Sequence, residues 1–161
     1  MSGTRRQRIG PTDESLLSLG KLQYLATYCP LHSKFPAVLL SRLFIPAIDN
    51  GCVRFFETAE GQVGAALIWA RLGQDVVERM TLDQVPPRPE DWVSGDQLWF
   101  LDLIAPFGQG AQVARHIARN PPDEPFWFAR VDHKGRLKRV VSGNAAHPKG
   151  QRLSMIRPGV V

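Results

Sequence analysis

One histidine stands where an acid–base catalyst could work. His32 lies in the short segment between Pro30 and Pro36, and both prolines limit the freedom of the backbone around it. An imidazole has an ordinary pKa of about 6.5, so it can take up a proton near neutral pH. The position therefore permits a general base, and a surface or helix-capping histidine is the other interpretation.

A carboxylate inside an apolar segment is the second candidate. Asp102 lies in residues 98–104, the most strand-like run of the chain. Strict alternation along a strand predicts that Asp102 shares a face with Leu98, Phe100 and Ile104, opposite Trp99, Leu101 and Leu103. A buried carboxylate without a partner is costly, so we expect it to bond with a donor such as a histidine or a backbone N–H. That bond could also be purely structural.

A glycine-rich loop follows this strand and precedes a helical pattern. Backbone N–H groups at a helix N-terminus can bind a phosphate or an oxyanion. The candidate residues for such a donor or oxyanion loop are Phe107, Gly108, Gln109, Gly110 and Ala111. Many turns of this kind use glycine for backbone geometry alone.

The elements that must position these residues follow from hydrophobic periodicity. The pattern predicts helices over residues 13–28, with Thr12 as the N-cap, and over 36–44, 75–82 and 111–119. It predicts strands over 51–56, 62–72, 98–104, 126–132 and 137–141. Pro30 limits the first helix, and Pro46 is expected to kink or stop the second. This order predicts an α/β (α+β) fold with a mostly antiparallel central sheet flanked by helices.

Length and composition indicate one domain. The 161 residues divide into a disordered basic arm (1–11), a folded domain (12–143) and a basic tail rich in Pro and Gly (144–161), expected to be poorly ordered. Cys29 and Cys52 are expected to be reduced thiols, since two cysteines form neither a disulfide framework nor a zinc motif. No signal peptide and no apolar run of about 18 residues is evident. We therefore expect a cytoplasmic protein with no membrane-spanning segment and no bound metal.

The net charge of +5 is concentrated in two segments. Residues 1–10 hold three arginines, residues 11–110 hold 7 basic and 12 acidic residues, and residues 111–161 hold 10 basic and 3 acidic ones. A basic segment favours an acidic partner. The cations are not interleaved with aromatics as in nucleic-acid-binding motifs, so we expect no nucleic acid. A solvated tail without any partner would carry the same charge.

Three segments resemble a known family, the RTX toxin-activating lysine acyltransferases that activate hemolysins and cyclolysins. Residues 30–48 (PLHSKFPAVLLSRLFIPAI) are similar to the N-terminal signature of the family, and residues 90–108 (EDWVSGDQLWFLDLIAPFG) to its central block. Residues 122–132 (PDEPFWFARVD) resemble a further segment. The resemblance extends over about residues 15–143 and leaves out the arm and the end of the tail.

The resemblance implies a GNAT-like acyltransferase fold and transfer of a fatty acyl chain to internal lysines of an RTX protoxin. The donor would be acyl-acyl carrier protein, whose phosphopantetheine thioester is a substrate, with no bound cofactor. The essential histidine and aspartate of the family fall on His32 and Asp102. An acidic carrier would suit the basic segment 111–161, where Arg115, Arg119 and Arg130 are candidate docking residues. The oligomeric state, including a homodimer, stays open.

Two departures from the family pattern bear on mechanism. Cys29 stands where the family commonly has Ser, and Gln109 where an acidic residue often follows Pro-Phe-Gly. In the simplest mechanism His32 takes the proton of the target lysine, and Asp102 orients the imidazole. The alternative is ping-pong transfer through an acyl-His32 or an acyl-Cys29. The resemblance predicts a polar cleft between the linker of the first two helices and the central strand, with His32 facing Asp102, and the one-step mechanism depends on that geometry.

Two other functions remain open at this point. One is a GNAT-type N-acetyltransferase that uses coenzyme A, although Ala105 stands where the corresponding signature has Gln or Arg. The other is a basic, non-catalytic binding module.

Overall fold

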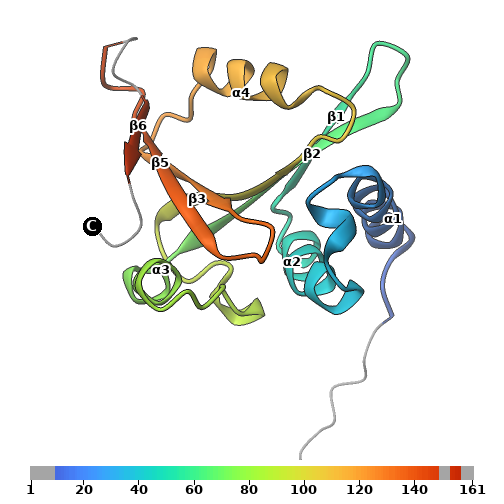
Figure 1. The fold of residues 1–161 in the computed structure, drawn as a ribbon, viewed down its shortest axis with the longest axis horizontal. Coiled ribbons are helices and arrows are strands. Elements are labelled where there is room, and N and C mark those ends of the chain that lie inside the picture. The colour runs from blue at the N-terminus through green and yellow to red at the C-terminus, as the bar shows by residue number, and fades with distance from the viewer. Residues whose placement is uncertain (1–9, 149–152, 157–161) are drawn as a thin grey trace, which may run out of the picture.

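A six-stranded mixed sheet organises the fold (Figure 1). The computed structural model describes residues 10–148 and 153–156. The strands are β1 (Val53–Glu57), β2 (Val63–Leu72), β3 (Gln97–Ile104), β4 (Phe126–Val131), β5 (Leu137–Gly143) and β6 (Leu153–Ile156), and they lie side by side in chain order. The helices are α1 (Asp13–Tyr28), α2 (Ala37–Asp49), α3 (Gln74–Leu82) and α4 (Gly110–Arg119), with short 3₁₀ turns η1 (His32–Lys34) and η2 (Pro89–Asp91).

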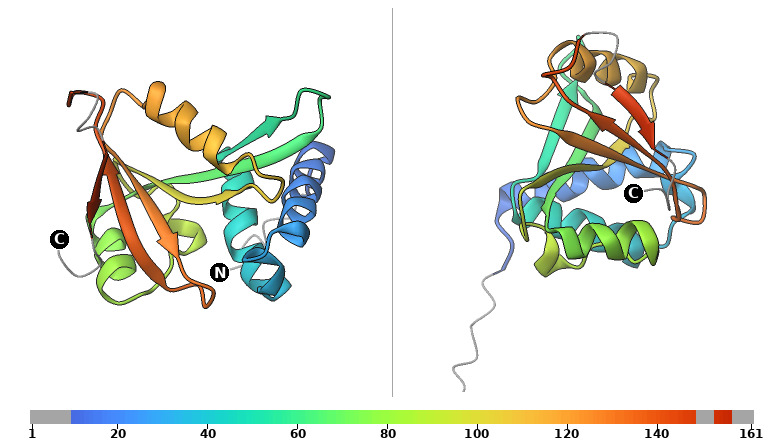
Figure 2. Two further views of the ribbon diagram at one scale, coloured as in Figure 1. Left: turned by 45° about the horizontal axis from the view of Figure 1, so that its top comes forward. Right: turned by 90° about the vertical axis from the view of Figure 1, so that its left-hand side faces the viewer.

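The helices form layers on both faces of the sheet. Helix α4 covers one face, and α1, α2 and α3 cover the other (Figures 1 and 2). Apolar side chains of α4, such as Val113 and Ile117, pack on the first face with Phe100 and Phe126. The larger core lies on the second face, between the three helices and the sheet; its members include Leu22, Leu25, Phe44, Ile68, Val76, Trp99 and Ile104. The chain therefore has a helix layer, a sheet and a second helix layer.

One pair of neighbouring strands runs parallel, and the other four pairs are antiparallel. A parallel neighbour needs a long crossover, which α4 supplies between β3 and β4. This parallel pairing has only three positions, Leu98–Phe126, Trp99–Trp127 and Phe100–Phe128. The two residues of β3 that follow, Leu101 and Asp102, lie just beyond it.

A β-bulge interrupts β3 at this same place. Ile68 pairs with Asp102, but the next residue of β2, Trp69, pairs with Phe100, so Leu101 is an extra residue. A bulge breaks the alternation of side chains and often re-aims one beside a functional site. The expected alternation holds as far as Leu101 and is wrong from Asp102 onward: Asp102 lies, like Leu101, toward the face covered by α1, α2 and α3.

Local signals explain where the first two helices begin and end. The Thr12 side chain accepts a hydrogen bond from the Ser15 backbone N–H at 3.1 Å, and α1 ends at Tyr28, before Cys29-Pro30. Helix α2 continues through Pro46 to Asp49, so the expectation that this proline could stop it is wrong. Pro46 has no backbone N–H, so the helix loses one hydrogen bond there, and burial of the apolar face of α2 offsets that loss.

The other elements agree closely with the sequence pattern, and the mostly antiparallel sheet is confirmed. Strand β6 was missed. It lies inside the tail expected to be poorly ordered, and it pairs antiparallel to β5, with Val140 opposite Ile156. Most of the basic arm and residues 149–152 and 157–161 lie outside the described residues. Among the described helices, none combines the length and apolar character needed to cross a membrane.

Candidate active site

The end of α1 and the middle of β3 bring His32 and Asp102 together. Helix α1 ends at Tyr28, and the following 3₁₀ turn directs the imidazole onto β3. The His32 Nε2 atom lies 2.5 Å from the Asp102 Oδ2 atom, although 70 positions separate the two residues in the chain. The His32 side chain is 2% exposed and the Asp102 side chain 14%. The predicted partner of the carboxylate and the predicted facing of the two side chains are confirmed.

Cys29 extends this pair to a row of three side chains. Its Sγ atom lies 2.9 Å from the other ring nitrogen of His32, Nδ1. Both nitrogens of the imidazole are therefore engaged, one by a sulfur and one by a carboxylate. Cys29 is partly buried, and both cysteines of the chain are free thiols. Within residues 10–148 and 153–156, no group of three or more His, Cys, Asp and Glu side chains is arranged to hold a metal ion.

The two neighbours of His32 determine its charge. Burial lowers the pKa of the imidazole, but the hydrogen bond and charge of Asp102, with a further contribution from Cys29, outweigh burial and raise this pKa to about 9. Burial likewise raises the pKa of the Cys29 thiol, but hydrogen bonds from the backbone and imidazole of His32 and the His32 charge lower it overall. Near neutral pH His32 is therefore an imidazolium between two groups that favour its positive charge.

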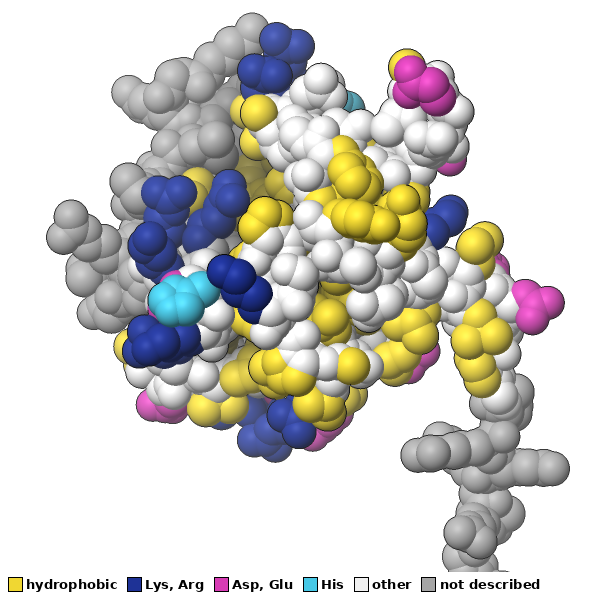
Figure 3. Space-filling model, turned by 45° about the vertical axis from the view of Figure 1, so that its right-hand side comes forward, with side chains coloured by type: hydrophobic (Ala, Val, Ile, Leu, Met, Phe, Trp, Pro, Cys, Tyr) yellow, Lys and Arg dark blue, Asp and Glu magenta, His cyan; other side chains and the backbone are white. Residues whose placement is uncertain are grey.

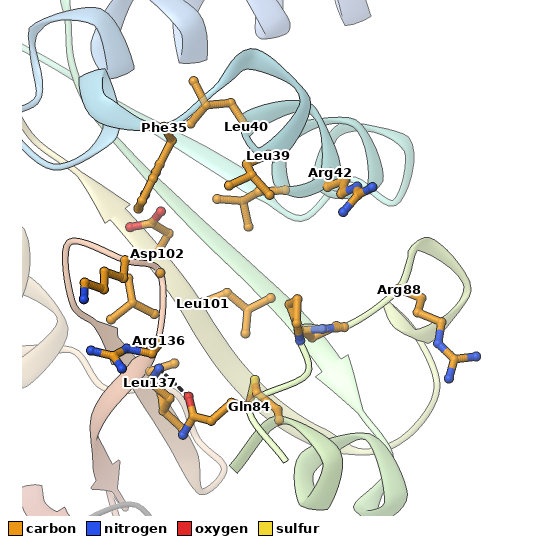
Figure 4. Close-up of a pocket in the computed structure, with 18 of the residues that line it drawn as sticks. Phe35, Leu39, Leu40, Arg42, Gln84, Arg88, Leu101, Asp102, Arg136 and Leu137 are labelled. Atoms are coloured by element: carbon orange, nitrogen blue, oxygen red, sulfur yellow. Dashed lines mark hydrogen bonds between the residues drawn. The ribbon is translucent and has the colours of Figure 1, made fainter. Parts of the chain in front are cut away.

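A groove of about 640 Å³ opens beside Asp102 (Figure 4). It lies between α2, the loop after α3, and the strands β3 to β5. Phe35 lies next to Asp102 in the close-up, and Leu39 and Leu40 project from α2 above it. Most of its lining side chains are apolar; they include Leu39, Leu43, Met80, Pro86, Pro87, Trp92, Leu101, Ala129, Val131 and Leu137. The expectation of a polar cleft is therefore wrong: the polar pair lies at the edge of an apolar groove.

His32 itself lines a second, smaller cavity of about 220 Å³. Phe35 and Leu40 line both cavities, so they separate the imidazole from the groove. Asp102 lines the groove and His32 lines the cavity. A ligand in the groove thus meets the carboxylate first and the imidazole behind it.

Basic and amide side chains complete the groove, and sequence reasoning missed them. Arg42, Arg88, Lys134 and Arg136 are the cations among its lining residues. Gln84 has a left-handed backbone (φ 58°), and its Oε1 atom accepts a hydrogen bond of 2.8 Å from the Leu137 backbone N–H, which joins the loop after α3 to β5 (Figure 4). One sequence feature indicated this side of the groove: the proline-rich run at 86–89 predicts an irregular, rigid loop after α3.

Comparison with known proteins shows which family of enzymes this chain resembles. The model of the RTX toxin acyltransferase family (HlyC) matches residues 12–144, most of the 161-residue chain. The chain belongs to this family. It is therefore an acyltransferase, and the groove with His32 and Asp102 is its candidate active site.

Individual relatives agree with the family model. The chain is similar to the RTX-I toxin-activating lysine-acyltransferase ApxIC of Actinobacillus pleuropneumoniae, with 34% identity over 76% of this chain and 70% of the relative. It is similar to the protein-lysine myristoyltransferase RtxC of Kingella kingae, with 35% identity over 71% of this chain and 68% of the relative. The protein-lysine myristoyltransferase HlyC of Escherichia coli is 33% identical over 76% of this chain and 71% of the relative.

The candidate oxyanion loop of this acyltransferase lies away from the groove. None of its five residues, Phe107 to Ala111, lines the groove or the smaller cavity. The Phe107 ring instead contacts the rings of Tyr24 and Tyr28 on α1, with centroids 6.4 and 5.9 Å apart. The Gln109 side chain packs against Gly64, and its buried Oε1 meets no hydrogen-bond donor among the described residues. Gly108 has φ 88°, so a turn requirement accounts for this glycine.

The three candidate docking arginines lie on the other face of the sheet. Arg115 and Arg119 are exposed on α4. The Arg130 guanidinium lies over the Phe128 ring, which packs on the α4 face. In the space-filling view, Lys and Arg side chains gather on one side of the molecule, next to patches of hydrophobic side chains (Figure 3). The structure thus separates Arg115, Arg119 and Arg130 from the groove, while other cations line it.

Proposed function

We propose that this acyltransferase moves a fatty acyl chain from acyl-acyl carrier protein to internal lysines of an RTX protoxin in the cytoplasm, and so activates the toxin. The observation that carries the proposal is an apolar groove with the Asp102–His32 pair at its edge. Relatives named lysine acyltransferases and myristoyltransferases support it. A GNAT-like arrangement fits the mixed sheet and its two helix layers.

The groove provides the surface for the acyl chain. Its apolar lining comes from three elements: Leu39 and Leu43 of α2, Leu101 of β3, and Ala129 and Val131 of β4. Burying a methylene group contributes about 0.8 kcal/mol, so a long chain gains most of its binding free energy here. The carbonyl carbon of the donor thioester then lies at the end of the groove, next to the Asp102–His32 pair.

The His32–Asp102 pair manages the protons of the reaction. A lysine ammonium with a pKa of about 10.4 must lose a proton before its nitrogen can attack a thioester. Because Asp102 lines the groove, its carboxylate attracts the ammonium. The proton then passes to His32 in its neutral form, which a pKa of about 9 leaves as the minor form at neutral pH. The nitrogen forms an amide bond with the acyl carbon, the carbon–sulfur bond breaks, and the carrier thiolate leaves with a proton from the imidazolium.

The carrier protein approaches a basic surface. Arg115, Arg119 and Arg130 remain candidates for this contact. The cations beside the groove, Arg42 and Lys134 among them, are a second candidate surface and lie nearer to Asp102. Since the phosphopantetheine arm must deliver its thioester to the groove, we favour the surface beside the groove. A homodimer remains compatible with either surface.

Coenzyme A is the alternative donor. Ala105 stands where the coenzyme A signature has Gln or Arg, and the loop that follows lies away from the groove. Both observations favour the carrier protein. The non-catalytic binding module is set aside, because the family consists of acyltransferases.

Purified components test the proposal. The enzyme is incubated with an RTX protoxin and with either acyl-acyl carrier protein or acyl-coenzyme A, and the protoxin lysines are analysed by mass spectrometry. We expect acylated lysines with the carrier protein as donor and at least tenfold fewer with coenzyme A. Unmodified lysines with both donors would contradict the proposed function, and equal transfer would contradict the choice of donor.

A further inference from the structure

The row Cys29–His32–Asp102 has the connectivity of a nucleophile, a base and an orienting acid. A nucleophile is activated when a base lies within hydrogen-bond reach and a third group holds the base. Here the thiol sulfur lies 2.9 Å from one imidazole nitrogen, and the carboxylate lies 2.5 Å from the other. The direct mechanism above uses only the second contact and leaves the first unexplained.

We infer that Cys29 is the nucleophile that carries the acyl chain between donor and lysine, with His32 and Asp102 as its proton-transfer partners. This inference rests on the proposed acyl transfer and specifies its route. Cys29 is partly exposed, whereas Cys52, the other cysteine, is 6% exposed in the core. The two thiols also differ in electrostatics: His32 lowers the pKa of Cys29, and burial raises the pKa of Cys52.

The reacting form in the first half-reaction is the Cys29 thiolate beside the His32 imidazolium, and the contact with His32 favours this form by lowering the pKa of the thiol. The Cys29 sulfur attacks the carbonyl carbon of the donor thioester and forms a new carbon–sulfur bond. The bond between that carbon and the carrier sulfur breaks, and the carrier thiolate takes the proton of His32. The products are acyl-Cys29, neutral His32 and the carrier thiol, so no other reactant is needed.

The second half-reaction restores the starting state. The free amine of a lysine attacks the acyl-Cys29 carbonyl, and neutral His32 takes the proton that the nitrogen loses. The carbon–sulfur bond breaks, the amide is formed, and the thiolate–imidazolium pair returns. This order answers a difficulty of the direct route: with a pKa of about 9, His32 is neutral in only about one molecule in a hundred at pH 7. The first half-reaction makes the neutral imidazole where the amine needs it.

Acyl-enzyme formation without any protoxin is the test. The enzyme is mixed with carrier protein bearing a labelled acyl chain, quenched in acid, and digested for mass spectrometry. We expect label on the Cys29 peptide that neutral hydroxylamine removes, and none on the Cys52 peptide, which is the internal control. We also expect iodoacetamide at pH 7 to alkylate Cys29 at least tenfold faster than Cys52, and Asp102→Asn to reduce that ratio.

Two variants keep the test independent of folding. Cys29→Ala and Cys29→Ser are compared with the wild type by thermal unfolding, and then in lysine acylation. We expect Cys29→Ala to reduce transfer at least 100-fold with an unfolding curve like that of the wild type, and Cys29→Ser to retain a part of the activity. Transfer by Cys29→Ala at the wild-type rate, or lysine product without label on Cys29, would overturn the inference and leave the proposed function standing. A wild type that forms acyl-Cys29 but modifies no lysine would overturn the proposed function instead.

Discussion

Leu101 and Asp102 are consecutive residues of β3, yet both side chains face the groove, because Leu101 is the extra residue of a β-bulge. A regular strand would direct them to opposite faces. The bulge therefore provides an apolar wall and a carboxylate at one position of the groove. The carboxylate bonds with His32, and the leucine packs against the core on the same side.

The groove predicts control over acyl chain length. Val131 lies on its wall and is partly exposed, so a larger side chain there should fill space without unfolding the protein. We expect Val131→Trp to reduce kcat/KM for a 16-carbon chain about tenfold or more, and to affect an 8-carbon chain less. Val93→Trp is the matched control, since Val93 is 62% exposed and outside the groove lining. Equal losses for both chain lengths would argue against this groove as the acyl site.

The raised pKa of His32 predicts how stability depends on pH. The folded state holds a proton on His32 up to about pH 9, whereas the unfolded chain loses it near the ordinary value of 6.5. The stabilisation is therefore fully present below pH 6.5 and is lost as the pH rises to 9; it amounts to about 3 kcal/mol at most. Urea unfolding between pH 6 and 9.5 measures it. We expect Asp102→Asn to flatten this dependence, and an unchanged slope would show that Asp102 does not hold the proton on His32.

Nuclear magnetic resonance can follow the same proton directly. With labelled histidine, we expect the His32 ring signal to titrate near pH 9 in the wild type and at lower pH in Asp102→Asn. His116, exposed on α4, provides a reference signal in the same spectrum. A His32 signal that titrates at its ordinary value in both proteins would contradict the electrostatic account.

Charge reversal predicts which surface receives the carrier protein. We expect Arg42→Glu combined with Lys134→Glu to raise KM for acyl-acyl carrier protein about tenfold at low salt and less at high salt, because these cations line the groove. Arg115→Glu with Arg119→Glu changes the charge equally on the α4 face and is the matched control. A larger rise in KM for the α4 pair would show instead that the carrier protein docks on α4, as the charge of segment 111–161 suggested.

Much of this site followed from local sequence signals. The Thr12 cap, the proline after Cys29 and the apolar run around Asp102 place the ends of α1 and the strand β3 correctly. A carboxylate among apolar residues required a partner, and His32 is that partner. These constraints act between neighbouring residues or follow from the cost of burying a charge, so they can be recognised in a single sequence.

The features that were missed depend on contacts between distant segments. The bulge at Leu101 arises from register with β2, and the groove is assembled from α2, the loop after α3 and the β4–β5 hairpin. The basic segment 111–161 looked like one surface, but α4 crosses to the far face of the sheet and separates Arg115 and Arg119 from the groove. Strand β6 was missed because Pro and Gly around it favoured an irregular tail. Strand pairing outweighed that local signal.

The most direct test of the account is a double-mutant cycle on His32 and Asp102, with acylation of a protoxin lysine as the readout. Removing a general base commonly costs 10²- to 10⁴-fold in rate. We predict that His32→Gln and Asp102→Asn each reduce kcat/KM at least 100-fold, and that the double variant is no slower than the slower single variant, because the two groups act as one unit. Thermal unfolding of each variant shows whether the fold is kept. Near wild-type transfer by either single variant, or losses that multiply in the double variant, would contradict the central claim that this pair performs the chemistry.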